Sequence, residues 1–179
     1  MTAFDQAFSL VVGFEGGYCD EHADPGNWTG GAVGCGILRG TKFGISAAAY
    51  PALDIAALTA KDAAAIYRRD YWAVVGGDDL PPPLALLVFD AAVNNGVGRA
   101  TRWLQQAVDA TVDGRIGPET LACIRRAVAA QGVQAIGSEF LARRLVFMAG
   151  LATWRTFGLG WARRLCALPF LSLTISAGD

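Results

Sequence analysis

The chain has 179 residues, of which 53% are apolar and 17% charged, so it can bury a sizeable core and is not a disordered chain. Its formal net charge is −1 and its 15 lysines and arginines are scattered, which excludes the basic patch of a nucleic-acid-binding protein. A single histidine, His22, and four cysteines without metal-ligand spacing argue against a zinc site, so we expect no metal ion or other cofactor.

The N-terminal segment has apolar side chains at helical spacing, which predicts a helix over residues 3–15 that Gly16 and Gly17 end. The segment lacks the basic region and the cleavage site of a signal peptide. No apolar run in the sequence reaches the ~20 residues that span a bilayer. We therefore expect a chain that is made in the cytoplasm and does not insert stably into a membrane.

Residues 16–45 are rich in glycine, aspartate, asparagine, proline and threonine, which predicts a long irregular stretch with room for a short β-hairpin. Its apolar members, Trp28, Ile37 and Phe43, favour an ordered functional loop over a disordered one.

Helical patterns resume after this loop. Ser46 is expected to cap a short helix through Tyr50, and Thr59 with Asp62 resembles a capping box at the start of a longer one. Strand signals are few, so the sequence predicts a mainly α fold. The later helices are expected at residues 84–95, 98–108, from Pro118 onwards, 133–153 and 157–168.

The cysteines fall into two groups. Cys19 and Cys35 lie in the long loop and could pair in an oxidising compartment, and the sequence leaves their redox state open. Cys123 and Cys166 lie in apolar helical runs and are predicted to be small core residues. The tryptophans at helical positions are also predicted to be core residues, namely Trp72, Trp154 and Trp161.

Glu15 is the first candidate for catalysis. The C-terminus of the predicted helix carries a partial negative charge, and the adjacent Phe14 would desolvate the carboxylate, so both effects raise the pKa of Glu15. A carboxylic acid that stays protonated near neutral pH can donate a proton to a leaving glycosidic oxygen. Taken alone, Glu15 is equally an ordinary glutamate at a frayed helix end, and Asp24 before Pro25 is an ordinary turn residue.

Three motifs in a fixed order change this interpretation. Glu15-Gly-Gly-Tyr18, then Asp24-Pro-Gly26, then Thr41-x-x-Gly-Ile-Ser46 resembles the start of glycoside hydrolase family 108, N-acetylmuramidases that include phage endolysins. The second half resembles the small peptidoglycan-binding domain that follows in this family. Further matching segments are residues 67–72, 90–96, 104–107, 112–117 and 157–161.

The resemblance implies a lysozyme-like helical catalytic domain over residues 1–96 and a helical peptidoglycan-binding domain over residues 97–179. It places the catalytic glutamate at Glu15 and its aspartate partner at Asp24. The third member, a threonine, falls on Thr41 because Gly44 and Ile45 follow it at the family spacing. Thr29 stays open, because an insertion of about Trp28 to Gly40 separates Thr41 from Asp24.

Further side chains are candidates for binding substrate. Tyr18 and Trp28 could stack on sugar rings or, equally, pin the loop to the body of the protein, and Thr29 offers a hydroxyl. Asn94 and Asn95 could bind N-acetyl groups through their amides, or could simply end the helix in which they lie.

The resemblance implies a bacteriolytic peptidoglycan hydrolase that cleaves the β-1,4 bond between N-acetylmuramic acid and N-acetylglucosamine. Its partner would be the glycan strand, and we expect a monomer. A phage endolysin of this kind would wait in the host cytoplasm until a holin opens the membrane. Two alternatives remain open: a lytic transglycosylase, which leaves 1,6-anhydro ends, and a non-catalytic wall-binding or secretion-helper protein.

Overall fold

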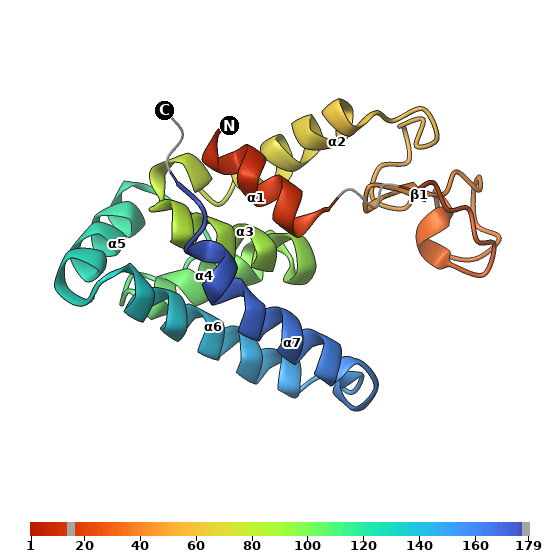
Figure 1. Ribbon diagram of the computed structural model, residues 1–179. Coiled ribbons are helices and arrows are strands. Elements are labelled where there is room, and N and C mark those ends of the chain that lie inside the picture. Colours follow the sequence, from red (N-terminus) through yellow and green to blue (C-terminus); the bar gives the residue numbers. More distant parts are fainter. Residues whose placement is uncertain (14–16, 177–179) are drawn as a thin grey trace. The chain divides into compact units, whose positions relative to one another are not determined.

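The fold is mainly α, as the sequence predicts, and contains one two-stranded hairpin among the described residues (Figure 1). The computed structural model describes residues 1–13 and 17–176. In chain order the elements are α1 (Ala3–Val11), the 3-10 helix η1 (Pro25–Asn27), β1 (Thr41–Lys42), β2 (Ile45–Ser46), α2 (Ala60–Tyr67), the π-helix η2 (Arg68–Trp72), the 3-10 helix η3 (Gly77–Asp79), α3 (Pro82–Asn95), α4 (Val97–Ala107), α5 (Pro118–Gln131), α6 (Val133–Ala149) and α7 (Trp154–Ser172).

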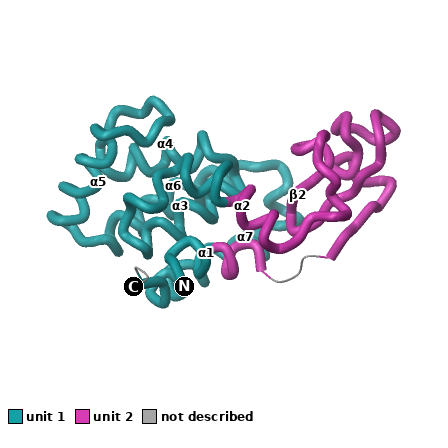
Figure 2. The backbone as a smooth tube through the Cα atoms, turned by 90° about the horizontal axis from the view of Figure 1, so that it is seen from above, with its two compact units in different colours: residues 1–7, 68–179 teal, residues 8–67 magenta. Residues whose placement is uncertain are grey.

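The chain divides into two compact units, shown in different colours in Figure 2. Unit 1 consists of residues 1–7 and 68–179, and unit 2 consists of residues 8–67. These are units of packing, whereas the predicted boundary between residues 96 and 97 separates two functions. That functional division stays a prediction.

Unit 1 is built around α3. Leu84 to Ala92 are all buried, so α3 is the buried core helix that its apolar sequence predicts. Helices α4, α6 and α7 pack against it. At its side, the rings of Phe4, Trp72 and Phe89 meet edge to face, with centroids 5.6 to 6.1 Å apart. Among the described residues, none of the helices has the length and apolar character that crossing a bilayer requires.

A charged cluster lies inside this helical packing. Asp90 of α3 is fully buried and accepts hydrogen bonds from Arg144 Nη1 of α6 at 2.6 Å and from Arg164 Nε of α7 at 2.8 Å. Arg144 is also fully buried, and its Nε donates to Asn95 Oδ1 at 2.7 Å. Burial lowers the pKa of Arg144, and the nearby Asp90 carboxylate opposes that shift. One carboxylate thus links three helices of unit 1.

Unit 2 consists mostly of the long loop, the β1–β2 hairpin and α2. The two strands are antiparallel, with Thr41 opposite Ser46. The hairpin turn contains Gly44 at φ 74°, and a Cβ there would lie 2.6 Å from Tyr67 Oη. The Tyr67 hydroxyl, from the end of α2, donates to the Phe43 carbonyl in the same turn at 3.0 Å. These contacts hold the hairpin against α2.

The start of α2 follows the predicted capping box. The Asp62 amide donates to Thr59 Oγ1 at 3.2 Å, and the Thr59 amide donates to Asp62 Oδ2 at 3.0 Å. The Thr59 hydroxyl also donates to Asp62 Oδ2, at 2.6 Å, and this hydrogen bond together with that of the Thr59 amide lowers the pKa of Asp62. After Tyr67, the helix continues as the π-helix η2, so the predicted long helix is present in two segments.

Two predictions are wrong: the position at which the N-terminal helix ends, and the short helix expected to begin at Ser46. Helix α1 ends at Val11, not at residue 15, and Gly13 takes the left-handed conformation after it, with φ 70°; Gly16, one of the two glycines predicted to end the helix, lies outside the described residues. The argument that placed Glu15 in the last turn of this helix therefore does not hold. Ser46 begins no helix: it ends β2, and its Oγ accepts from the Ala49 amide in a single turn.

The C-terminal helices also differ from their predicted limits. Helix α6 ends at Ala149 rather than Thr153, and α7 runs from Trp154 past Pro169 to Ser172. Trp154 and Trp161 are half-buried, with ring centroids 6.0 Å apart and ring planes inclined at 51°, so they are not core residues. Cys166 is exposed, contrary to the prediction, so the apolar run in which it lies does not bury it. Cys123 is buried as predicted, and Cys19 and Cys35 are exposed and free.

Candidate active site

Glu15 lies outside the described residues, as do its neighbours Phe14 and Gly16. The geometry of the candidate site is therefore that of its partners in unit 2. The predicted partners are Asp24 and one of two threonines, Thr41 or Thr29.

Asp24 lies directly before η1 and caps it. Its Oδ1 accepts a hydrogen bond from the Gly26 amide at 2.8 Å, which fixes the side chain in an Asx turn. The residue is exposed, and its Oδ2 accepts no hydrogen bond from the described residues. The turn therefore holds the carboxylate in place through one oxygen and leaves the other available to a substrate or a water molecule.

Asn27, the last residue of η1, is a site residue that the sequence motifs do not single out. It is fully buried, and its Nδ2 donates to the Glu21 carbonyl at 2.9 Å. Its Oδ1 accepts from the Thr41 hydroxyl at 2.7 Å. Its backbone carbonyl accepts from the amides of Arg39 and Gly40 at 2.9 and 3.1 Å. Asn27 thus joins the turn of Asp24 to the strand of Thr41.

The insertion between Asp24 and Thr41 closes on itself. Trp28 pairs with Leu38 in an antiparallel bridge, and the Thr29 amide donates to the Ile37 carbonyl at 3.0 Å. The two ends of the insertion therefore lie side by side. As a result, Thr41 lies within hydrogen-bonding distance of Asn27, although the insertion separates the two residues in sequence.

The two candidate threonines differ in what their hydroxyls do. Thr29 Oγ1 accepts from the Ile37 amide at 2.9 Å, within the inserted segment. Thr41 Oγ1 instead bonds to Asn27, the residue that ends the helix capped by Asp24. The contacts favour Thr41 as the residue coupled to Asp24, while Thr29 shapes the insertion.

The two aromatic candidates are held in different ways. The Trp28 indole donates to the His22 carbonyl at 2.9 Å, and its ring meets the His22 ring edge to face with centroids 4.7 Å apart. Both contacts lie within the long loop, so they hold Trp28 against another part of the loop, and its binding of sugar rings stays a prediction. Tyr18 is 43% exposed and lines a pocket of unit 2. Its ring thus has the accessible face that a binding residue needs.

Asn94 and Asn95 lie in unit 1, at the end of α3. Asn94 Nδ2 donates to the Asp90 carbonyl of its own helix at 2.8 Å, and the side chain is exposed. Asn95 is half-buried and holds Arg144 through its Oδ1. For Asn95 these contacts favour a structural role over binding of N-acetyl groups, because its amide oxygen already accepts a hydrogen bond from Arg144.

The motif over residues 112–117 forms a turn that Gln105 of α4 organises. The buried Gln105 amide donates to Asp113 Oδ1 at 2.7 Å and to the Arg115 carbonyl at 3.0 Å, and its Oε1 accepts from the Gly114 amide at 2.9 Å. The hydrogen bond from Gln105, with a second from the Arg115 amide, lowers the pKa of Asp113. The spacing of this motif is therefore explained by the folding of the turn itself.

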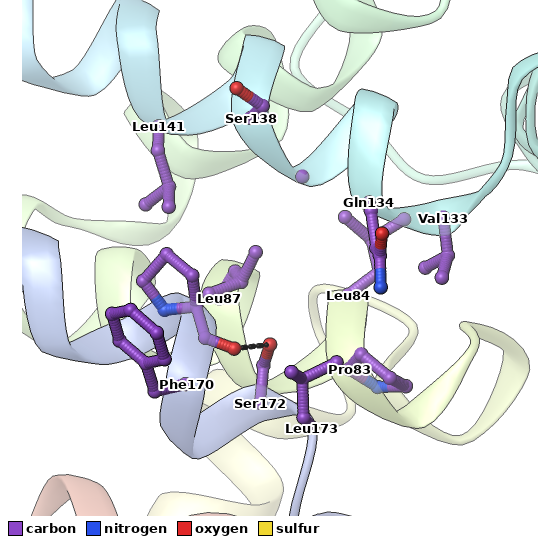
Figure 3. Close-up of a pocket in the computed structure, with 12 residues that line it drawn as sticks. Pro83, Leu84, Leu87, Val133, Gln134, Ser138, Leu141, Phe170, Ser172 and Leu173 are labelled. Atoms are coloured by element: carbon purple, nitrogen blue, oxygen red, sulfur yellow. Dashed lines mark hydrogen bonds between the residues drawn. The ribbon is translucent and has the colours of Figure 1, made fainter.

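An apolar pocket of about 370 Å³ opens in unit 1 between α3, α6 and α7 (Figure 3). Leu87, Leu141 and Phe170 line it, and the hydrogen bond drawn there runs from Ser172 Oγ to the Pro169 carbonyl at 2.8 Å. None of the described residues that line it carries a carboxylate. The pocket therefore lacks the groups needed to cleave a glycosidic bond.

The unit 2 site offers carboxylate chemistry. Asp24 supplies an accessible carboxylate and Thr41 a hydroxyl that is anchored to the same turn. Among the described histidine, cysteine, aspartate and glutamate side chains, none are grouped so as to hold a metal ion. Glycoside cleavage needs two carboxyl groups, one that donates a proton and one that is ionised.

Comparison with known proteins agrees with this chemistry. Residues 8–96 match the family model described as Glycosyl hydrolase 108. The solved structure of Brucella abortus SagA is similar to the chain, with 34% sequence identity, a TM-score of 0.77, and coverage of 98% of this chain and 97% of that chain. This likeness supports the predicted lysozyme-like helical fold. No curated protein matches the chain in sequence. Because the family model matches residues 8–96 and the likeness to SagA extends over nearly all of both chains, the chain belongs to the glycosyl hydrolase 108 family and carries a glycoside hydrolase domain.

Proposed function

We propose that the protein is an N-acetylmuramidase that hydrolyses the β-1,4 bond between N-acetylmuramic acid and N-acetylglucosamine in peptidoglycan. Membership of the family supports a peptidoglycan hydrolase in general. The observation that carries the finer proposal is the coupling of Asp24 to Thr41 through the buried Asn27. The motif order in the sequence adds Glu15 to this pair.

In the proposed mechanism, Glu15 donates a proton to the glycosidic oxygen as the bond breaks. Asp24 stabilises the positive charge that develops on the sugar ring, or orients the attacking water. It does so through Oδ2, which accepts no hydrogen bond from the described residues. Thr41 and Asn27 hold the turn that positions Asp24. Carboxyl groups about 5 Å apart would give retention of configuration, and a separation of roughly 6.5–9.5 Å would give inversion.

Asp24→Asn should lower the rate of peptidoglycan hydrolysis by roughly a hundredfold or more, because it removes the charge that meets the oxocarbenium-like transition state. An asparagine oxygen can still accept from the Gly26 amide, so the turn is kept. The measurement is the release of reducing ends from purified peptidoglycan, with circular dichroism as the check on folding. Wild-type activity in a folded Asp24→Asn protein would remove Asp24 from the mechanism.

Thr41→Val and Thr29→Val form a matched pair, because each replaces a hydroxyl by a methyl group of similar size. Thr41→Val breaks the hydrogen bond to Asn27 and leaves a buried Oδ1 without its donor, so we expect a loss of roughly tenfold in kcat/KM. Thr29→Val alters the insertion alone and should cost less than about threefold. The release of reducing ends is measured for both variants and decides which threonine supports catalysis. A larger loss of activity in Thr29→Val than in Thr41→Val would make Thr29 the third site residue.

The remaining roles follow from the same proposal. Residues 97–179 would bind peptidoglycan beside the catalytic domain, and the protein would act as a monomer on glycan strands. A phage endolysin released through a holin is the biological setting that the family resemblance suggests. If the protein were instead a non-catalytic wall-binding or secretion-helper protein, it would leave the turbidity of a peptidoglycan suspension unchanged, whereas we expect the turbidity to fall.

A further inference from the structure

A second pocket, of about 460 Å³, lies within unit 2 and has no place in the mechanism above. Three segments form it: Tyr18 before the first bridge of the loop, the end of the insertion at Leu38 and Arg39, and the turn over residues 52–56. Its lining includes one cationic and one anionic side chain, Arg39 and Asp54.

Arg39 is anchored but only partly used. Its Nη1 donates to the carbonyls of Pro51 and Leu53 at 3.0 and 3.4 Å, which fixes the guanidinium at the pocket. Its Nε and Nη2 donate to no acceptor among the described residues. A guanidinium has five N–H donors in a planar fork that matches a carboxylate. The remaining donors are therefore suited to an anionic ligand.

Asp54 supplies the opposite charge without neutralising Arg39. Its Oδ1 accepts from the Ala57 amide at 3.3 Å, which holds the side chain at the turn. None of the ion pairs between described residues joins Asp54 to Arg39. Two opposite charges thus line one pocket without pairing with each other.

The third wall is the ring of Tyr18. It lies against the backbone of Gly40, where φ is 77° and a Cβ would come within 2.6 Å of the ring atom Cε2. This close packing, which only glycine permits, fixes the position of the ring. The pocket therefore has a rigid aromatic side as well as two charged groups.

We propose that this pocket binds the peptide stem of peptidoglycan, with Arg39 on a stem carboxylate and Asp54 on a stem ammonium group. The inference rests on the proposed function and names a second part of its substrate. In stem-bearing peptidoglycan the lactyl carboxyl group of N-acetylmuramic acid forms an amide with the stem, so the glycan backbone offers only uncharged hydroxyl, ether and amide groups. The free carboxylates and the amine of an uncrosslinked stem are the groups that match two unpaired opposite charges.

The test is calorimetric titration of the full-length protein, at low salt, with a soluble stem tetrapeptide that contains diaminopimelate and has an acetylated N-terminus, since the stem N-terminus is an amide in the wall. A second peptide carries an acetyl group on its free side-chain amine. We expect Arg39→Gln to weaken binding of both peptides by roughly tenfold, the loss of one charge-assisted hydrogen bond. Asp54→Asn should weaken binding of the free-amine peptide by roughly tenfold and leave binding of the acetylated peptide as in the wild type.

Matched controls keep the test sharp. Asp54→Asn is isosteric and can still accept from the Ala57 amide, so it addresses the pocket even if Arg39→Gln disturbs the turn at Pro51 and Leu53. Lys61→Gln removes one positive charge from an exposed site on α2 and should bind both peptides like the wild type.

Two results would overturn the inference: a wild-type protein that does not bind the tetrapeptide, or an Asp54→Asn variant that binds both peptides as the wild type does. Hydrolysis of intact purified peptidoglycan by the wild-type protein is measured separately. Cleavage of intact peptidoglycan without tetrapeptide binding overturns the peptide site and leaves the proposed function standing. Tetrapeptide binding with the expected pattern but no cleavage supports the peptide site and overturns the proposed function.

Discussion

Glu15→Gln is expected to reduce hydrolysis of purified peptidoglycan by roughly a hundred- to ten-thousandfold, the contribution of a general acid. Glutamine has the same shape as glutamate but has no proton to give to a leaving oxygen. The assignment rests on the Glu-Gly-Gly-Tyr motif and on the family of the chain, since the end of α1 at Val11 removes the helix-terminus argument.

The measurement for this variant is the initial rate of reducing-end release, compared with the urea midpoint of unfolding. Glu119→Gln is the control, because Glu119 is an exposed carboxylate in the first turn of α5 in unit 1. We expect Glu119→Gln to stay within about twofold of the wild-type rate. An active Glu15→Gln protein would mean that a different group protonates the leaving oxygen.

Asp90→Asn is expected to lower the free energy of unfolding by about 3–5 kcal/mol, because it leaves the fully buried Arg144 without its counter-ion. The amide has the size of the carboxylate, so the loss arises from the charge rather than from a cavity. Asp90 also bonds to Arg164, and the change therefore weakens the links from α3 to both α6 and α7.

A matched change on α6 separates burial from ion pairing. Glu139 pairs with Arg143 one turn apart on the surface, with side chains 53% and 30% exposed. Glu139→Gln makes the same chemical change and should cost less than about 0.5 kcal/mol, as exposed pairs do. Urea unfolding curves give both values from their midpoints and slopes. Equal losses in the two variants would contradict the account of Asp90 as a buried structural charge.

Elements with local signals could be predicted from the sequence. The capping box of Thr59 and Asp62, the start of α5 at Pro118 and the buried α3 depend on neighbours in the chain, and the structure confirms all three. Helix ends were less predictable. Helix α1 ends at Val11, just before Gly13, rather than at Gly16 and Gly17, which the sequence favoured. For α7, the spacing of apolar residues does not tell which of its faces another element covers.

Contacts between distant residues could not be predicted. The hydrogen bond of Thr41 to Asn27 requires that the insertion close at Trp28 and Leu38, and no local pattern states that. Asn27 itself resembles any asparagine in a turn until its burial is known. The same holds for Asp90, whose partners in α6 and α7 lie far along the chain. The motifs supplied the residue types of the candidate site, and the folded loop supplied their connections.

Mass spectrometry of the products tests the central claim most directly. Purified peptidoglycan is digested with the wild-type protein, and the released fragments are analysed with and without borohydride reduction. We predict fragments that end in reducible N-acetylmuramic acid. Fragments that end in 1,6-anhydro-N-acetylmuramic acid would show a lytic transglycosylase, and reducible N-acetylglucosamine ends would show a different glycosidase, so either result would contradict an N-acetylmuramidase.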